Sequence, residues 1–226
     1  EIYCANEDWI SSWINNIKLW RPRGIMGAKW SYQIHDVDQG LRKDMVNDTT
    51  LRSAYKTGAT NYHTTILNKF TKNAEFKRRF INKFYDLFNT SLKRDSMINV
   101  LNRFVNTFNA EIPRAVAAFP LDPGMPRNGE NKFDTNSIVK FNKNIDEIKY
   151  FIYNRQNVIR NQLVSEFQLS SSDTALVTVG VAPGSIGKGK VKLNSLKPTD
   201  QYWSGYYLKS NQIEAEAIAE PGYVFH

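Results

Sequence analysis

The stretch NAEFKRRFINKFYDLF, residues 73–88, decides the fold of this chain. Its apolar residues recur at steps of three and four, which is the spacing of one helical face; they are Phe76, Phe80, Ile81, Phe84, Leu87 and Phe88. Asn73 is a residue type that caps helix N-termini. The pattern predicts an amphipathic helix over residues 74–89 whose aromatic stripe belongs to the core.

Further helices are predicted on both sides of this one. A second opens near Asp95 and closes before Pro113, and its apolar positions are Met97, Leu101, Phe104, Val105 and Phe108. The third and longest carries Ile138, Phe141, Ile145, Ile148, Ile152, Ile159 and Leu163 on one face. Residues 44–72 are expected to hold one or two less regular helices, including Thr64–Phe70. Residues 119–129 are dense in Pro and Gly and are expected to form a connection or a substrate-facing loop.

The pattern changes to short strands after residues 170–172. The predicted strands are Leu176–Val179, Lys190–Leu193, Gly205–Leu208, Ile213–Ala217 and Tyr223–Phe225. Four aromatic residues at 202, 203, 206 and 207 fit either a sugar-stacking platform or the core and rim of a small β unit. We therefore expect an α+β chain with two domains: a mainly helical lobe over residues 1–169 and a small, truncated β-rich module over residues 173–226.

Two carboxylates follow a predicted strand near the N-terminus. The strand is Trp30–Ile34, and His35-Asp36-Val37-Asp38-Gln39-Gly40 comes directly after it. Side chains at i and i+2 of an extended chain point the same way, and Gly40 permits a sharp turn, so Asp36 and Asp38 are candidate ligands of a hard divalent cation. The same residues also suit a plain turn or a helix cap.

Further polar residues lie upstream of this acidic pair. The first group is Asn6-Glu7-Asp8-Trp9, and the second is Asn15-Asn16-Ile17-Lys18-Leu19-Trp20-Arg21. In the second group, the residues after the asparagine pair are predicted to form a strand. Phosphoryl transfer needs a carboxylate that orients the attacking hydroxyl, an amide oxygen on a metal, and a further aspartate on the metals. Asp8, Asn15 or Asn16, and Asp38 are the candidates for those three places.

These motifs resemble the CotH-type atypical kinases, a family named for a bacterial spore-coat protein. The family pattern N-x-D-W, N-N-x-K-x-W-R and W-x-x-x-x-x-D-x-D-x-G is similar to residues 6–9, 15–21 and 30–40. Residues 73–80, 86–90 and 112–114 resemble its later motifs N-P-E-F-R-x-R-F, D-L-L-N-T and E-x-P-R-H-I. The resemblance covers roughly residues 1–168. It departs at residues 10–14, which replace the usual Pro-Gly, and at Gln39, where an aromatic is common.

The resemblance implies a fold, a reaction and a set of site residues. It implies a kinase-like C-lobe that transfers phosphate from ATP to protein hydroxyls, with Asp8 as the catalytic residue. Mg²⁺ or Mn²⁺ would be held by Asp36, Asp38 and either Asn15 or Asn16. A lysine that grips the phosphates would come from an upstream lobe, so we expect the isolated chain to be inactive. The family also implies a secreted or bacterial cell-surface location and a protein substrate.

Two other classes of function stay open. A noncatalytic surface or coat protein could keep this fold for binding, with the β module as an adhesion or glycan element. A nucleotide-sugar transferase could use Asp36 and Asp38 as its metal motif, although no alternating strands and helices precede them.

Composition and charge indicate the kind of protein and the kind of partner. The 226 residues are 41% hydrophobic and 13% aromatic, which suits a globular body. The net charge of +8 favours anionic partners, but the basic residues between 69 and 83 are expected to be a solvated helix face and no nucleic acid is expected. The single cysteine, Cys4, is expected to pack in the core, and no apolar run is long enough for a transmembrane segment.

Overall fold

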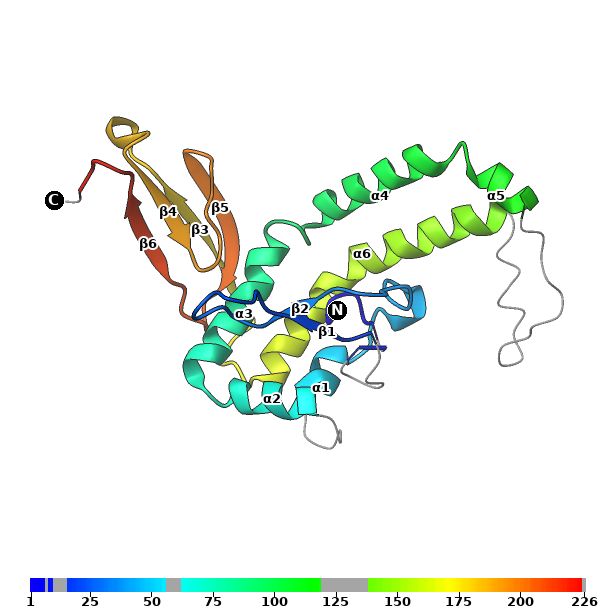
Figure 1. Cartoon of the computed structure of the whole chain (residues 1–226), viewed down its shortest axis with the longest axis horizontal. Coiled ribbons are helices and arrows are strands. Elements are labelled where there is room, and N and C mark those ends of the chain that lie inside the picture. The colour runs from blue at the N-terminus through cyan, green and yellow to red at the C-terminus, as the bar shows by residue number, and fades with distance from the viewer. Residues whose placement is uncertain (7, 10–15, 56–61, 119–137, 225–226) are drawn as a thin grey trace.

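The computed structural model describes residues 1–6, 8–9, 16–55, 62–118 and 138–224 (Figure 1). The helices in these ranges are α1 (Thr50–Tyr55), α2 (Tyr62–Thr71), α3 (Ala74–Phe88), α4 (Arg94–Phe108), α5 (Ile112–Ala118) and α6 (Ile138–Glu166). The strands are β1 (Lys18–Trp20), β2 (Ser31–Gln33), β3 (Thr174–Gly180), β4 (Gly189–Leu193), β5 (Tyr202–Leu208) and β6 (Ala215–Ala219). The predicted α+β class is confirmed.

Helix α3 is the predicted amphipathic helix, and it forms within one residue of the predicted bounds. Asn73 is its N-cap, because the Asn73 side chain accepts a hydrogen bond from the backbone N–H of Phe76 at 2.9 Å. The face that carries Ile81, Phe84 and Phe88 is buried. Its aromatic rings contact one another and the ring of Phe167 beyond α6, so the stripe is core as predicted.

The long helix α6 is the second wall of the core. Ile152, Ile159 and Leu163 of the predicted apolar face are buried along it. Phe151, which is not on that predicted face, is buried as well, whereas Ile138 of the predicted face is 47% exposed. Helices α1 and α2, which fall within the predicted irregular stretch, pack against each other, and α1 also contacts α6. The N-terminal turn adds Ile2, Tyr3 and Ala5 to the same buried cluster.

The second predicted helix is shorter than expected. It ends at Phe108 rather than continuing to the residue before Pro113, and a separate helix, α5, holds Pro113 as its second residue. Proline lacks the N–H donor but is tolerated in a first turn, where that donor has no helical partner. Helix α4 buries none of its residues, although it contacts α6, and Phe104 remains 57% exposed. Residues 119–129, predicted as a connection, lie outside the described residues.

The C-terminal segment forms two antiparallel strand pairs, β3 with β5 and β4 with β6. These cover four of the five predicted strands. The prediction of a strand at 223–225 is wrong for Tyr223 and Val224, which follow a turn closed by the Tyr223 N–H bonding to the Glu220 carbonyl at 3.0 Å. Residue 225 lies outside the described range.

The β segment is joined to α3 through Asp86, whose side chain is fully buried. The Asp86 carboxylate accepts hydrogen bonds from the backbone N–H of Ser195 at 2.9 Å, the Ser195 hydroxyl at 2.6 Å and the Tyr207 hydroxyl at 2.8 Å. Asn194 adds a longer bond at 3.3 Å. Figure 1 shows the strands standing over α3, so the helix is a support shared by the helical part and the β segment. The division into two domains at about residue 170 stays a prediction.

Candidate active site

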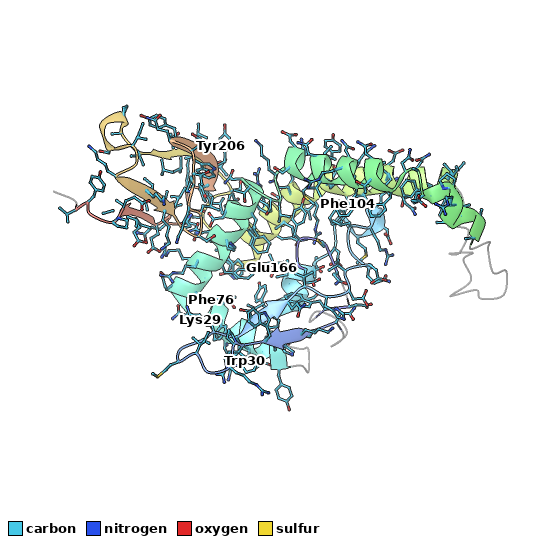
Figure 2. All side chains as sticks on the ribbon, turned by 45° about the horizontal axis from the view of Figure 1, so that its top comes forward. Lys29, Trp30, Phe76, Phe104, Glu166 and Tyr206 are labelled. Carbon is cyan, nitrogen blue, oxygen red and sulfur yellow. The ribbon has the colours of Figure 1, made fainter. Side chains whose placement is uncertain are left out.

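The site lies where the β1–β2 hairpin meets the N-terminal turn. Strand β1 pairs with β2 in antiparallel register, with Leu19 opposite Tyr32, and both strands are exposed along their whole length. Asp36 and Asp38 follow β2, as predicted from the strand-like run before them. Figure 2 places Trp30, the residue before β2, at the outer edge of the molecule, far from Phe104 of α4.

Asn6 connects the segments that carry Asp8 and Asp36. Its side chain is fully buried, and its amide donates to the backbone carbonyl of Asp36 at 3.3 Å and to the Glu1 carboxylate at 2.7 Å. Its amide oxygen accepts from the backbone N–H of Asp8 at 3.3 Å. One buried amide therefore fixes both acidic segments, although they are far apart in sequence.

Asn16 approaches the same point from the other side. Its side-chain amide also donates to the Asp36 carbonyl at 3.3 Å. Asn16 and Asp36 both have left-handed backbones, with φ of 41° and 52°, a conformation that asparagine and aspartate tolerate better than most residues. The bond uses the nitrogen of the Asn16 side chain and not its oxygen, which is the atom that would coordinate a cation. Asn15, the alternative metal ligand, lies outside the described residues.

The two predicted carboxyl groups interact electrostatically. A hydrogen bond between the Asp36 and Asp38 side chains raises the pKa of Asp36, the negative charges of Asp38 and Asp8 raise it further, and the nearby His35 lowers it. Asp36, Asp38 and Asp8 are thus close enough for their charges to interact, and a cation at this turn would relieve that repulsion.

Gly40 fits the acidic turn for a reason that the sequence did not predict. Glycine is needed at residue 40 because there is little room for a side chain, and not because the backbone has an unusual φ. An added Cβ would lie 3.1 Å from the Cys4 Cβ and 3.1 Å from the Val37 carbonyl oxygen. The turn is closed by the Gly40 N–H bonding to Val37 at 2.9 Å, and the Leu41 N–H bonds to the Cys4 carbonyl at 2.8 Å. A side chain at residue 40 would push the acidic turn away from the N-terminal turn.

Cys4 is a packing residue at the base of this turn. It is partly buried and packs against the core cluster, and burial raises the pKa of its thiol. A raised pKa disfavours the thiolate, which is the nucleophilic form. This agrees with the predicted core role and argues against a nucleophile.

Arg155 of α6 anchors the N-terminal turn from below. Its guanidinium is fully buried and donates to the carbonyls of Ile2 at 3.1 Å, Tyr3 at 3.0 Å, Val46 at 2.8 Å and Asp48 at 2.7 Å. Desolvation lowers its pKa to about 10. No local sequence signal predicts these roles of Arg155 and Asn6, because Arg155 is one of many charged residues on a long helix and Asn6 is one member of a motif.

The donor set suits a hard cation. Asp36, Asp38 and Asn16 offer only oxygen, the donor type that Mg²⁺ and Mn²⁺ prefer. In the parts of the chain that the structure describes, no three histidine, cysteine or acidic side chains are grouped closely enough to hold a metal by themselves. A cation at this turn would therefore be held by the two carboxylates, helped by an amide oxygen.

One cavity lies away from these residues. It has a volume of about 550 Å³ and lies between α3 and the β segment. The two carboxylates on its wall are already partnered, since Asp86 accepts the four bonds described above and Glu214 pairs with Arg78 at 3.1 Å. Its size alone does not make it the site of the predicted chemistry.

Comparison with known proteins gives a family. A family model described as "CotH kinase protein" matches residues 1–159, which is more than half of the chain. This match, together with the α+β fold, defines a kinase-like protein. The chain belongs to the CotH kinase protein family. No curated protein and no solved structure matches the chain significantly.

None of the helices in the described ranges combines the length and the apolar character that crossing a bilayer requires.

Proposed function

We propose that this chain supplies the catalytic lobe of an atypical protein kinase, which transfers the terminal phosphate of ATP to a protein hydroxyl. Kinase-like family membership makes phosphoryl transfer the first reaction to consider. The acceptor belongs to a protein, and the location is outside the bacterial cell or on its surface.

The proposed roles follow the chemistry of each side chain. Asp8 orients the acceptor hydroxyl and accepts its proton. Asp36 and Asp38, with the amide oxygen of Asn16 or Asn15, hold Mg²⁺ or Mn²⁺, and that ion would neutralise charge on the nucleotide phosphates. Asn6 keeps the two acidic segments at a fixed separation.

One observation carries the proposal: two asparagine side chains donate hydrogen bonds to the backbone carbonyl of Asp36. Asn6 and Asn16 both donate to the Asp36 carbonyl, and the same Asn6 side chain accepts from the Asp8 backbone. A surface turn that only reversed the chain would not need two asparagine amides from separate segments on one carbonyl. These bonds support the proposal that the Asp8 segment and the acidic turn act together.

Binding of ATP tests the metal assignment. In the longest natural protein that carries these residues, calorimetry is expected to detect ATP binding that requires Mg²⁺ or Mn²⁺. Asp38→Ala should reduce it at least tenfold. Asp146→Ala is a matched control, because Asp146 is an exposed aspartate on α6 with 76% of its side chain accessible. Metal-independent binding, or equal binding by Asp38→Ala and the control, would refute the assignment.

Phosphate transfer tests the role of Asp8. Asp8→Asn removes the proton acceptor but keeps a side chain of similar size, so ATP binding should persist while transfer to a protein substrate falls by about 10²-fold or more. Transfer at the normal rate by Asp8→Asn would exclude Asp8 as the base. A natural protein that neither binds ATP nor transfers phosphate would favour the noncatalytic surface or coat role.

A further inference from the structure

The aromatic residues of β5 are divided between the two faces of the strand. Tyr202 and Tyr206 are 57% and 52% exposed, whereas Tyr207 is 1% exposed and belongs to the core cluster. Trp203 is partly buried and packs against the same core. Alternation along a strand explains the division. Only two of the four aromatic residues are therefore available to a partner.

Strand β3 completes the outer face. In the β3–β5 register, Leu176 pairs with Tyr206, Thr178 with Ser204, and Gly180 with Tyr202. All six of these residues are exposed. The hydroxyls of Thr178 and Ser204 bond to each other at 2.8 Å, midway between the two tyrosines. We call these six residues the tyrosine face.

Gly180 lets one tyrosine ring lie close to the sheet. A Cβ added at Gly180 would lie only 2.4 Å from Cδ1 of Tyr202 and 2.6 Å from the backbone carbonyl oxygen of Gln201, so the ring and the neighbouring backbone occupy the space that any larger residue would fill. The Tyr202 ring therefore covers the backbone of β3 instead of extending away from it. A ring held in this way offers a fixed apolar surface at little cost in conformational entropy.

Tyr206 is fixed by its backbone. The side chain of Asn89, just after α3, donates to the Tyr206 carbonyl at 2.9 Å and accepts from the Tyr206 N–H at 3.0 Å. Figure 2 shows Tyr206 on the β segment, well separated from Trp30 of the candidate active site. The tyrosine face is therefore anchored to the helical part through α3 but is distinct from the acidic turn.

The charge of the tyrosine face argues for a neutral partner. The chain carries a net charge of +8, yet none of the six residues is charged. Anionic partners such as nucleic acid or phospholipid would be met by lysine and arginine, and none is present on this face. A second copy of the chain is also a poor fit, because stable association needs roughly 800 Å² per partner, an area supplied by about 20–30 residues.

We propose that the tyrosine face binds a neutral oligosaccharide. Tyrosine rings combine an apolar surface, which can cover the C–H face of a sugar, with a hydroxyl that hydrogen-bonds its edge. Tyr202 and Tyr206 are four residues apart, or about 13 Å along the strand, so an extended chain of several sugars would contact both. The hydroxyls of Thr178 and Ser204 lie between these contacts and can bond sugar hydroxyls. The proposal is independent of kinase activity.

Saturation-transfer NMR with cellohexaose and chitohexaose, two neutral extended oligosaccharides, tests this proposal on the whole chain. At least one is expected to receive saturation from the protein, and Tyr206→Ala and Tyr202→Ala should each weaken its binding about tenfold or more. Tyr223→Ala is the matched control, because Tyr223 is 48% exposed but lies outside the tyrosine face. The Tyr223→Ala variant should bind the oligosaccharide as tightly as the unmodified chain does.

Gly180→Ala is a second test that keeps every aromatic residue. The added methyl group clashes with the Tyr202 ring and with the Gln201 carbonyl oxygen, so the ring must move from its place on the sheet. Oligosaccharide binding should therefore weaken while the helical circular dichroism signal stays close to normal. The proposal is overturned if neither oligosaccharide binds. It is equally overturned if the two tyrosine variants bind as the control does, or if Tyr206→Ala instead dissociates a dimer seen by light scattering.

Discussion

Replacing Arg155 with methionine should destabilise the chain by about 3 kcal/mol. The guanidinium is fully buried and makes four bonds to backbone carbonyls. Two of those carbonyls keep a second partner: Ile2 accepts from the Ala5 N–H, and Asp48 accepts from the Gln162 side chain. The carbonyls of Tyr3 and Val46 lose the bond described here, and methionine fills much of the remaining space.

The magnitude follows from two opposing terms. Leaving two buried acceptors unpaired costs about 1–3 kcal/mol each, or about 2–6 kcal/mol together. Removing a buried charge gives part of this back, because burial disfavours the charged guanidinium enough to lower its pKa to about 10. A net loss of about 3 kcal/mol corresponds to a fall of roughly 6–12 °C in melting temperature for a chain of this size.

Urea unfolding followed by circular dichroism measures this loss directly. Arg103→Met is the matched control, because Arg103 is exposed on α4 and its replacement should change stability by no more than about 0.5 kcal/mol. Hydrogen exchange at residues 2–6 should also accelerate in Arg155→Met, since their anchor is gone. A loss below about 1 kcal/mol, with exchange in the N-terminal turn unchanged, would refute the view that this guanidinium holds the turn in place.

Three further predictions concern α3. Asp86→Asn should lower the free energy of unfolding by about 2–4 kcal/mol, because the amide N–H₂ of asparagine would face N–H and O–H groups that now donate to the carboxylate. Urea unfolding measures this loss, and a value near zero would contradict the buried network. Asn73→Ala should lower stability by about 1 kcal/mol through loss of the N-cap, and an unchanged midpoint would show that this cap contributes nothing. Hydrogen bonding to Arg78 lowers the pKa of Glu75 from 4.5 to about 2, so its stabilising effect is present above pH 4.5 and is lost as the pH falls toward 2. Glu75→Gln should therefore flatten that part of the acid-unfolding curve, and a curve that keeps its shape would show that the ion pair is irrelevant.

Local patterns predicted the helices well because their signals are short-range. The spacing of Phe76, Phe80 and Phe84 and the cap at Asn73 are sufficient to place α3. The end of α4 is harder to predict from sequence, because a proline such as Pro113 can lie in the first turn of a helix as well as follow the end of one. Strand pairing depends on a partner, so the apolar run at residues 223–224 predicts a strand although it pairs with no strand that the structure describes.

The candidate site was only partly predictable for a related reason. The acidic pair could be found because Asp36 and Asp38 follow a strand at a regular spacing. The residues that hold this turn come from distant positions, and nothing in the local sequence around Asn6 or Arg155 announces a bond to a backbone carbonyl. The four aromatic residues of β5 suggested a platform, but only the register with β3 selects Tyr202 and Tyr206.

The junction at Asp86 has a practical consequence for anyone who trims this protein. The family match ends at residue 159, yet the partners of the Asp86 carboxylate are residues 194, 195 and 207. A shortened version cut at the match boundary would keep the acid and discard every group that satisfies it. Such a fragment would expose the unpaired Asp86 carboxylate and the apolar face of α3 to solvent. Poor solubility of the fragment would then result from the truncation and not from the family fold.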